Sequence, residues 1–348
     1  YKSLMNEGFR ELKRTCPLYS IIGKKLIVHN IAKYYKKGVN ILAYSGIGGQ
    51  AVMEGVMMKN KDTYAVAVRK PDHEIVVEKR EYKGICPNTV IKNLIFVRGI
   101  INFIESMILG ISTLTFSASF FEEEETTKEK KEYKKGKKEK VEMGFTILVS
   151  IVLAVAIFMV LPFGISLLFQ NFIPFETVVI LIEGMIRIAI FLGYILLISQ
   201  MEDIKRVFMY HGAEHKCINC IEQGMELTIE NVKKSSKEHK RCGTSFLFFV
   251  VIITIIATMF IRVDSKLLRL VLRIAIVPLI AGISYEIIRL AGRSDHIIVN
   301  FLSKPGLWMQ KLTTREPDED MIEVGIASVE AVFDWKQYIQ SIRKKEDL

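Results

Sequence analysis

Residues 175–199 read FETVVILIEGMIRIAIFLGYILLIS, an almost uninterrupted apolar run. Covering the roughly 30 Å of hydrocarbon in a bilayer takes about 20 helical residues. Three further stretches have similar length and composition: Phe145 to Phe169, Thr244 to Val263 and Leu267 to Leu290. Four such stretches in one chain predict an α-helical integral membrane protein and argue against buried core helices of a soluble protein.

The segments between these stretches are strongly polar. Half of the 348 residues are apolar and a quarter are charged, with a mean hydropathy of +0.26. Residues 122–142 hold eight lysines and residues 200–243 hold eight Lys or Arg, whereas the connectors around Asn171 and Asp264 are short. Because Lys and Arg collect in cytoplasmic loops, we expect both long loops on the cytoplasmic side of the membrane.

A fifth apolar stretch, Val90 to Phe121, is interrupted by Gly99 and Gly110 and carries three charged residues, Lys92, Arg98 and Glu105. The region before it is also basic, so a single crossing would place that region on the far side. We therefore expect residues 90–121 to form an interfacial or re-entrant helix. A true fifth span is the alternative.

The first 45 residues hold nine Lys or Arg against two Glu, within a net charge of +10. Apolar residues recur among the basic ones, as in an amphipathic helix on an anionic membrane surface. We therefore expect membrane lipids as a partner of this arm. No nucleic-acid recognition motif is present, so we expect no specific nucleic-acid partner.

Residues 46–58 read GIGGQAVMEGVMM, with three glycines within four residues. Such glycines indicate tight backbone geometry or the close approach of another group. Gln50 and Glu54 would then reach a polar partner in the loop of residues 200–243, and an ordinary turn with a surface glutamate is the alternative. Alternation over residues 63–69 and 74–83 predicts a β-hairpin, so the cytoplasmic portion should be α+β.

These patterns divide the chain into eight parts, given in order. They are a basic amphipathic arm (1–45), a Gly-rich segment with a β-hairpin (46–89), an interfacial, re-entrant or membrane helix (90–121), a charged linker (122–144), a transmembrane hairpin (145–199), a cytoplasmic His/Cys loop (200–243), a second transmembrane hairpin (244–290) and a cytoplasmic tail (291–348).

The His/Cys loop contains the motif H-x-x-E-H, as His211-Gly212-Ala213-Glu214-His215. On a helix the two imidazoles lie one turn apart on one face, where both can reach one metal ion. Glu214 would lie beside that ion, placed to take a proton from bound water. Metallopeptidases use this inverted order of the zincin motif. The spacing predicts His211 and His215 as zinc ligands and Glu214 as the catalytic base.

A catalytic zinc needs a third protein ligand and an open position. His239 and Cys242 follow within the same loop, and Glu286 lies at the end of the last expected span. Two alternatives stay open. Cys217 and Cys220 with His239 and Cys242 would make a closed, structural zinc site. The His and Glu side chains could also form a hydrogen-bonded network without a metal.

Charged residues lie inside the expected spans. Glu183 and Arg187 are four residues apart on one span, and Arg269 and Arg273 on another. Intramembrane charges usually pair, face a protein interior or mark a pathway. Glu183 and Arg187 could form an i,i+4 pair and the other two could snorkel outward. The alternative is a polar cavity for transport or for a lipid headgroup.

Several strings together resemble the YqhQ family of uncharacterised bacterial integral membrane proteins. They are GGQAVMEGVMM from Gly48, HGAEHK from His211, HKRCGTSF from His239, AGISYE from Ala281 and LTTREPD from Leu312. The resemblance covers about residues 48–332. It implies a membrane protein described as a predicted metal-dependent enzyme, with signature polar positions at Gln50, Glu54, His211, Glu214, His215, His239, Arg241, Cys242 and Glu286. Cys217 and Cys220 are not part of that pattern.

We therefore expect a zinc-dependent membrane hydrolase that acts near the inner leaflet, on a protein or lipid-linked substrate. The alternative is a non-enzymatic scaffold, insertion factor or transport component, with a structural zinc or no metal. Four spans are few for a transporter, so transport would call for a homo-oligomer.

Overall fold

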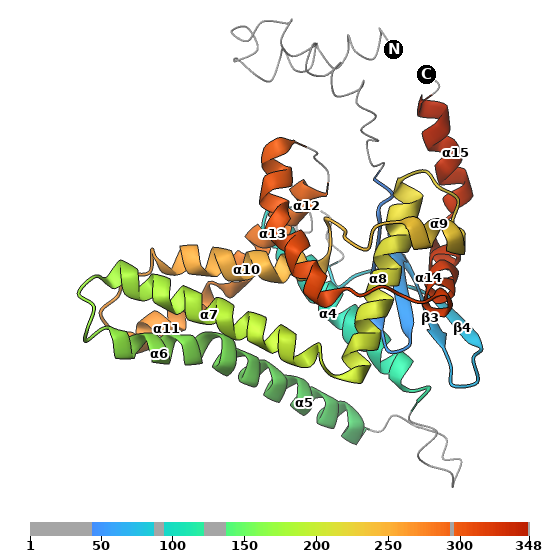
Figure 1. Cartoon of the computed structure of the whole chain (residues 1–348). Coiled ribbons are helices and arrows are strands. Elements are labelled where there is room, and N and C mark those ends of the chain that lie inside the picture. The colour runs from blue at the N-terminus through green and yellow to red at the C-terminus, as the bar shows by residue number, and fades with distance from the viewer. Residues whose placement is uncertain (1–43, 87–93, 122–136, 293–295, 347–348) are drawn as a thin grey trace, which may run out of the picture.

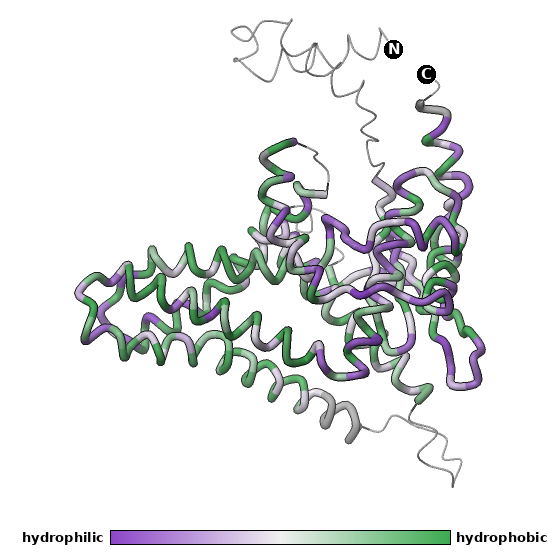
Figure 2. The backbone as a smooth tube through the Cα atoms, in the orientation of Figure 1, coloured by the Kyte–Doolittle hydropathy of each residue, from purple (hydrophilic) through white to green (hydrophobic). Residues whose placement is uncertain are grey.

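The computed structural model describes residues 44–86, 94–121, 137–292 and 296–346. The chain is mostly helical, with a four-stranded sheet near its N-terminal end. Long helices form an elongated bundle beside a part that contains the sheet (Figure 1). The two parts differ in hydropathy: the bundle is mainly hydrophobic, whereas the part with the sheet contains both hydrophobic and hydrophilic residues (Figure 2). The expected basic arm lies outside the described residues except for Tyr44 and Ser45, as does most of the charged linker.

The sheet is antiparallel and its strands follow in chain order, β1 (Ile47–Val52), β2 (Gly55–Asn60), β3 (Thr63–Arg69) and β4 (Ile75–Glu81). The predicted hairpin is confirmed as β3 and β4. The glycine-rich segment forms a second hairpin, β1 and β2, in which Val52 pairs with Gly55 across Met53 and Glu54. Glu54 has a positive φ of 48°, which makes the reversal tight.

Helices cover both faces of the sheet. On one face lie α8 (Glu202–Glu222) and α14 (Glu319–Val332), which share a buried core with Val56, Met58 and Ala67. On the other face Leu109 and Phe116 of α4 (Val97–Ala118) pack against alternate strand residues. The short α9 (Ile229–Lys234) lies against α8 and α14. The strand period of two thus gives each helix layer its own set of apolar side chains.

The bundle contains the longest apolar helices. Helix α5 (Lys137–Val155) continues through a π-helical turn, η3 (Ala156–Val160), into α6 (Leu161–Phe169), and α7 (Glu176–Ile198) returns beside it. Helices α11 (Lys266–Ala275) and α12 (Val277–Ala291) likewise follow one another almost directly. Within the described residues, four helices are long and apolar enough to cross a membrane: Val97–Ala118, Gly144–Phe169, Glu176–Ile198 and Lys266–Ala291.

One expected span is shorter than predicted, and the stretch of residues 90–121 contains a long helix. The expected span from Thr244 to Val263 is a helix of only 16 residues, α10 (Gly243–Thr258), which is short for a full crossing. The stretch expected to form an interfacial or re-entrant helix, with a true span as the alternative, is one continuous helix, α4, through its described part, and it is long and apolar enough to cross a membrane. Its second half packs on the sheet, a contact that apolar periodicity alone does not reveal.

A buried charge cluster joins α7 to α11. The Glu183 carboxylate accepts hydrogen bonds from Arg187 at 2.9 Å and from Arg273 at 2.5 Å. All three side chains are buried, so the expected i,i+4 pair is confirmed. The expected snorkelling of Arg273 is wrong, because its guanidinium turns inward to this carboxylate. Arg269 instead reaches the Val263 carbonyl and Glu176.

The cluster predicts a large effect of Glu183→Gln on stability. Removing this carboxylate leaves two guanidinium groups buried without a counterion, which should lower the free energy of unfolding by about 3 kcal/mol or more. The matched change Glu176→Gln breaks a more exposed pair and should cost less than about 1 kcal/mol. Unfolding of both variants in the same detergent checks this, and equal losses would contradict the structural role of Glu183.

Candidate metal centre

Helix α8 carries the H-x-x-E-H motif outside the candidate spans. Glu202 and Asp203 lie in its first turn, where carboxylates stabilise the positive end of the helix dipole. The helix ends before Gly224, whose φ of +72° lets the Met225 N–H return to the Cys220 carbonyl. The predicted helical placement of both histidines is therefore confirmed.

The second half of α8 is buried although many of its residues are polar. Buried polar side chains need hydrogen-bond partners, and one loop supplies those of Lys216 and Asn219. Lys216 donates to the carbonyls of Lys233 and Ser235, and Asn219 donates to those of Ser236 and Glu238. These bonds hold the 233–239 loop along α8, and the chain then reaches Cys242 at the start of α10.

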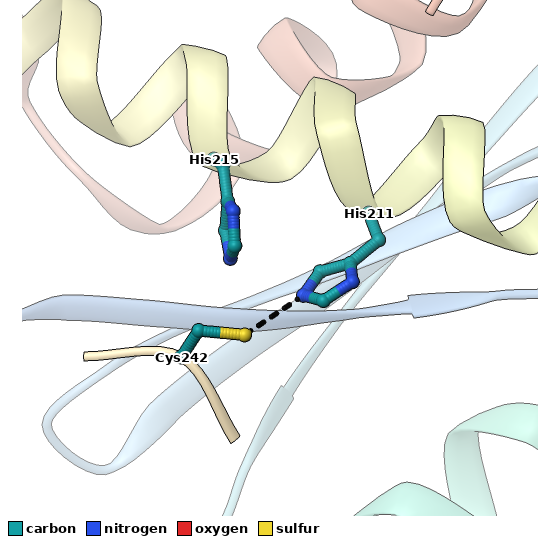
Figure 3. A group of neighbouring side chains, drawn as sticks. All are labelled: His211, His215 and Cys242. Carbon is teal, nitrogen blue, oxygen red and sulfur yellow. Dashed lines mark hydrogen bonds between the residues drawn. The ribbon is translucent and has the colours of Figure 1, made fainter. Parts of the chain in front are cut away.

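His211, His215 and Cys242 converge at this point (Figure 3). One ligand atom from each, a ring nitrogen or the sulfur, lies within 4.8 Å of the other two. The His211 Nε2 is 3.2 Å from the Cys242 Sγ. The two imidazole rings are 4.4 Å apart between centroids. Two residues from one helix turn thus meet a third that lies 27 residues beyond His215 in the sequence.

Backbone carbonyls orient both imidazoles. The Nδ1 of His211 is 2.9 Å from the Thr313 carbonyl, and the Nδ1 of His215 is 2.6 Å from the Lys237 carbonyl. A carbonyl can only accept, so each Nδ1 carries the proton and each Nε2 is left to face the group. Metal-binding histidines commonly have this outer hydrogen bond, which fixes both the tautomer and the ring plane.

Glu214 lies directly beside the group. Its Oε2 is 3.9 Å from the His211 Nε2, and its carboxylate accepts a hydrogen bond from the Gly49 N–H of strand β1. The side chain is buried, and a Cβ on Gly49 would lie 2.9 Å from the Glu214 Cγ. Burial raises the pKa of the Glu214 carboxyl, against the opposing charges of His215 and His211. A raised pKa suits a carboxylate that accepts and releases a proton.

Charge in the group is shared between the thiol and the imidazoles. Burial acts to raise the pKa of Cys242, but His211 and His215 together outweigh it and hold that pKa well below its usual range. Burial likewise opposes protonation of His211, yet the Cys242 sulfur raises the pKa of that imidazole to about 9. Cys242 also caps α10, since its sulfur accepts from the Thr244 N–H. The group therefore stabilises a thiolate.

His239 and Arg241 lie next to the group and serve another network. The ring of His239 is 5.6 Å from that of His215, but its Nε2 is directed to Glu222, 3.6 Å away. Arg241 also binds Glu222 and lies over the Tyr44 ring. Hydrogen bonds and charges from His239 and Arg241 outweigh burial and lower the pKa of Glu222 to about 2. His239 is therefore not brought into the three-residue group.

The other expected ligands lie elsewhere. The Cys217 sulfur lies against Gly325, and that of Cys220 points to the carbonyls of Met225 and Glu226. Burial raises the pKa of Cys217 and raises that of Cys220 to about 11, so both stay thiols. The described residues thus do not assemble the four-ligand site of Cys217, Cys220, His239 and Cys242. Glu286 pairs with Arg98 across α12 and α4.

Gln50 and Glu54 do reach polar partners. Glu54 binds Arg206 and accepts from the Tyr210 hydroxyl at 3.1 Å, both on α8. Gln50 turns to the opposite face of the sheet and donates to the Thr113 hydroxyl of α4 at 2.8 Å. The expected packing of the glycine-rich segment against the histidine helix is confirmed through Glu54 and Gly49, and the Gln50 partner lies on a different helix.

Two positions that sequence reasoning missed hold the site together. A Cβ on Gly212 would lie 2.0 Å from the Arg315 carbonyl, so α8 and the 313–317 segment touch through bare backbone. Gln310 of α13 (Ile297–Thr313) binds both the N–H and the carbonyl of His239. A glycine inside a helix usually has a packing reason, and that signal was present at Gly212. Nothing in the sequence marks Gln310.

The comparisons with known proteins identify the family and leave its function open. A family model described as "Protein of unknown function (DUF1385)" matches residues 94–335. The chain is also 36% identical over 286 residues to the "Uncharacterized protein YqhQ" of Bacillus subtilis (strain 168), covering 81% of this chain and 90% of that protein. No solved structure matches the chain. The chain therefore belongs to this family of uncharacterised proteins, as the motifs predicted.

The contact at Gly212 predicts opposite effects of the same substitution at two glycines. Gly212→Ala places a methyl group against the Arg315 carbonyl and should lower the free energy of unfolding by about 1–3 kcal/mol. Gly193→Ala, on α7 with nothing within 4 Å of the added Cβ, should be neutral or stabilising by up to about 1 kcal/mol. Denaturation of the two purified variants measures both, and a neutral Gly212→Ala would show that the contact is unimportant.

Proposed function

We propose that this member of the YqhQ family is a zinc-dependent hydrolase that acts at a membrane surface. The observation that carries the proposal is the convergence of His211, His215 and Cys242 with the Glu214 carboxylate beside them. Two imidazoles and a thiolate are ligands that zinc prefers, and three protein ligands are the number that leaves a coordination position open for catalysis.

The residues present fit such an ion. Both Nε2 atoms and the sulfur face one another, and the low pKa of Cys242 supplies the thiolate that a metal requires. The carbonyls of Thr313 and Lys237 supply the outer hydrogen bonds expected of ligand histidines. When bound, zinc would act as a Lewis acid and lower the pKa of a water molecule towards about 7.

Glu214 would perform the proton transfers. Its carboxylate takes one proton from the attacking water, whose oxygen forms the new bond to the acyl or phosphoryl centre. The same proton then passes to the leaving group as the old bond breaks, which balances the hydrolysis. Burial of Glu214 excludes bulk water, and the Gly49 N–H holds the carboxylate in place.

We further propose a cytoplasmic position for this site, in a bacterial cytoplasmic membrane. The segment of residues 200–243, which contains the site, holds eight Lys or Arg and supports this side by the charge rule of membrane proteins. The site lies where α8 meets the start of α10, next to the apolar bundle. A substrate that is membrane-embedded, membrane-bound or lipid-linked would reach this junction most readily.

Metal analysis of purified protein tests the proposal. Wild type should hold about one zinc per chain, as expected for one three-ligand site. His211→Ala and Cys242→Ser should lose it. Glu214→Gln should keep the zinc and lose hydrolysis of a panel of peptide, ester and phosphodiester substrates by about 10²- to 10⁴-fold.

Cys220→Ser is the matched control, because it removes a thiol from α8 that does not face the group. It should keep the zinc. Wild type without zinc, after purification free of chelators, would refute the proposal. Zinc that survives His211→Ala but is lost on changing Cys217 or Cys220 would show a structural site instead.

A further inference from the structure

Strand β1 forms one edge of the sheet and has a single strand neighbour, β2, among the described residues. Its sequence, IGGQAV, contains no charge. The opposite edge strand, β4, reads IVVEKRE, and such charges deter pairing with another chain. The two edges therefore differ, because β4 is protected and β1 is not.

The register shows which β1 groups face outward. The Arg69 N–H donates to the Glu54 carbonyl. In an antiparallel sheet, successive residues of an inner strand direct their N–H and carbonyl groups to opposite neighbours. Every second residue from Glu54 therefore bonds to β3, and the β2 residues between them bond to β1. The β2 residues that bond to β1 pair with Gly48, Gln50 and Val52. The N–H and carbonyl groups of Ile47, Gly49 and Ala51 therefore point away from β2, to the free edge.

The outward N–H groups of Ile47 and Gly49 have partners, the Ser45 hydroxyl and Glu214. For the Ala51 N–H and the carbonyls of Gly49 and Ala51, the described part of the chain supplies no partner. Nothing lies within 4 Å of a Cβ built on Gly48, which is exposed. Among the described residues, this edge therefore keeps backbone groups that no partner uses.

The free edge leads directly to the candidate catalytic group. A Cβ on Gly49 would lie 2.9 Å from the Glu214 Cγ, so β1 touches the carboxylate beside the three-residue group. The Ala51 N–H and the carbonyls of Gly49 and Ala51 are complementary to the backbone of another extended segment, which would bind by adding a strand. A polypeptide paired with β1 would thus carry one of its own amide bonds past Glu214.

We infer that the substrate is an extended polypeptide segment that pairs with the free edge of β1, which makes the proposed hydrolase a peptidase. The inference rests on the proposed function for the cleavage of the peptide. Pairing itself needs neither zinc nor catalysis, so it can be measured separately.

The test is peptide binding to full-length Glu214→Gln protein in detergent, followed by fluorescence anisotropy. The probe is a labelled heptapeptide of alternating threonine and valine with lysine at both ends, acetylated and amidated. It should bind, and Ala51→Pro in the same background should weaken binding about tenfold or more, because proline removes one outward N–H. Lys79→Pro, the matched change on β4, should leave binding unchanged.

A second probe avoids any change in the protein. The same peptide with N-methyl groups along both edges cannot pair with a strand and should not bind. Absence of binding by the unmodified peptide, equal binding of the methylated one, or equal loss with Lys79→Pro would overturn the inference. If wild type purified free of chelators holds no zinc but the peptide still binds, the proposed hydrolase is refuted and the pairing stands.

Discussion

Helix α8 is polar in sequence, yet it is buried on nearly all sides over its second half. A buried polar group without a partner costs several kcal/mol, so each of these side chains constrains a neighbouring segment. Lys216 and Asn219 hold the 233–239 loop, Glu222 holds Ser45 and Arg241, and the histidines hold two further carbonyls. The positions of the surrounding segments follow from these bonds.

Two glycines allow close contacts with neighbouring segments on opposite sides of this helix. Gly49 admits Glu214 on the sheet side, and Gly212 admits the Arg315 carbonyl on the other. Because neither position tolerates a Cβ in its present contact, the sheet, α8 and the 313–317 segment form one packed unit. Cys242 then links that unit to the bundle, as the first residue before α10. The candidate metal centre is thus a junction between the sheet part and the apolar helices.

The sequence predicted those parts of the fold that depend on local pattern. Apolar length marked the spans of α5 to α7 and of α11 to α12, alternation marked β3 and β4, and spacing placed His211 and His215 on one helix face. Long-range pairing was not predictable in the same way. Cys242 joins the histidines and His239 does not, because Glu222 and Gln310 hold His239 back, and both lie far from it in sequence.

Membrane placement shows the same limit. Periodicity cannot distinguish a helix that crosses lipid from one whose second half covers a sheet, so the packing of α4 on the sheet was not predicted. For Glu54 the sequence was sufficient: the glycine-rich segment around it predicted a polar partner, and that partner lies on α8. The neighbouring sequence predicted a side chain's partner where a single close contact fixes that side chain. It did not predict the partner where several segments distant in sequence position the side chain together.

The central claim is that His211, His215 and Cys242 bind one zinc ion and leave a position open. X-ray absorption at the zinc edge of the purified protein tests this most directly, because sulfur and nitrogen or oxygen neighbours have distinct distances. The account predicts a single sulfur neighbour at about 2.3 Å, with the remaining neighbours nitrogen or oxygen at about 2.0–2.1 Å. Two or more sulfur neighbours, or protein that takes up no zinc, would contradict it.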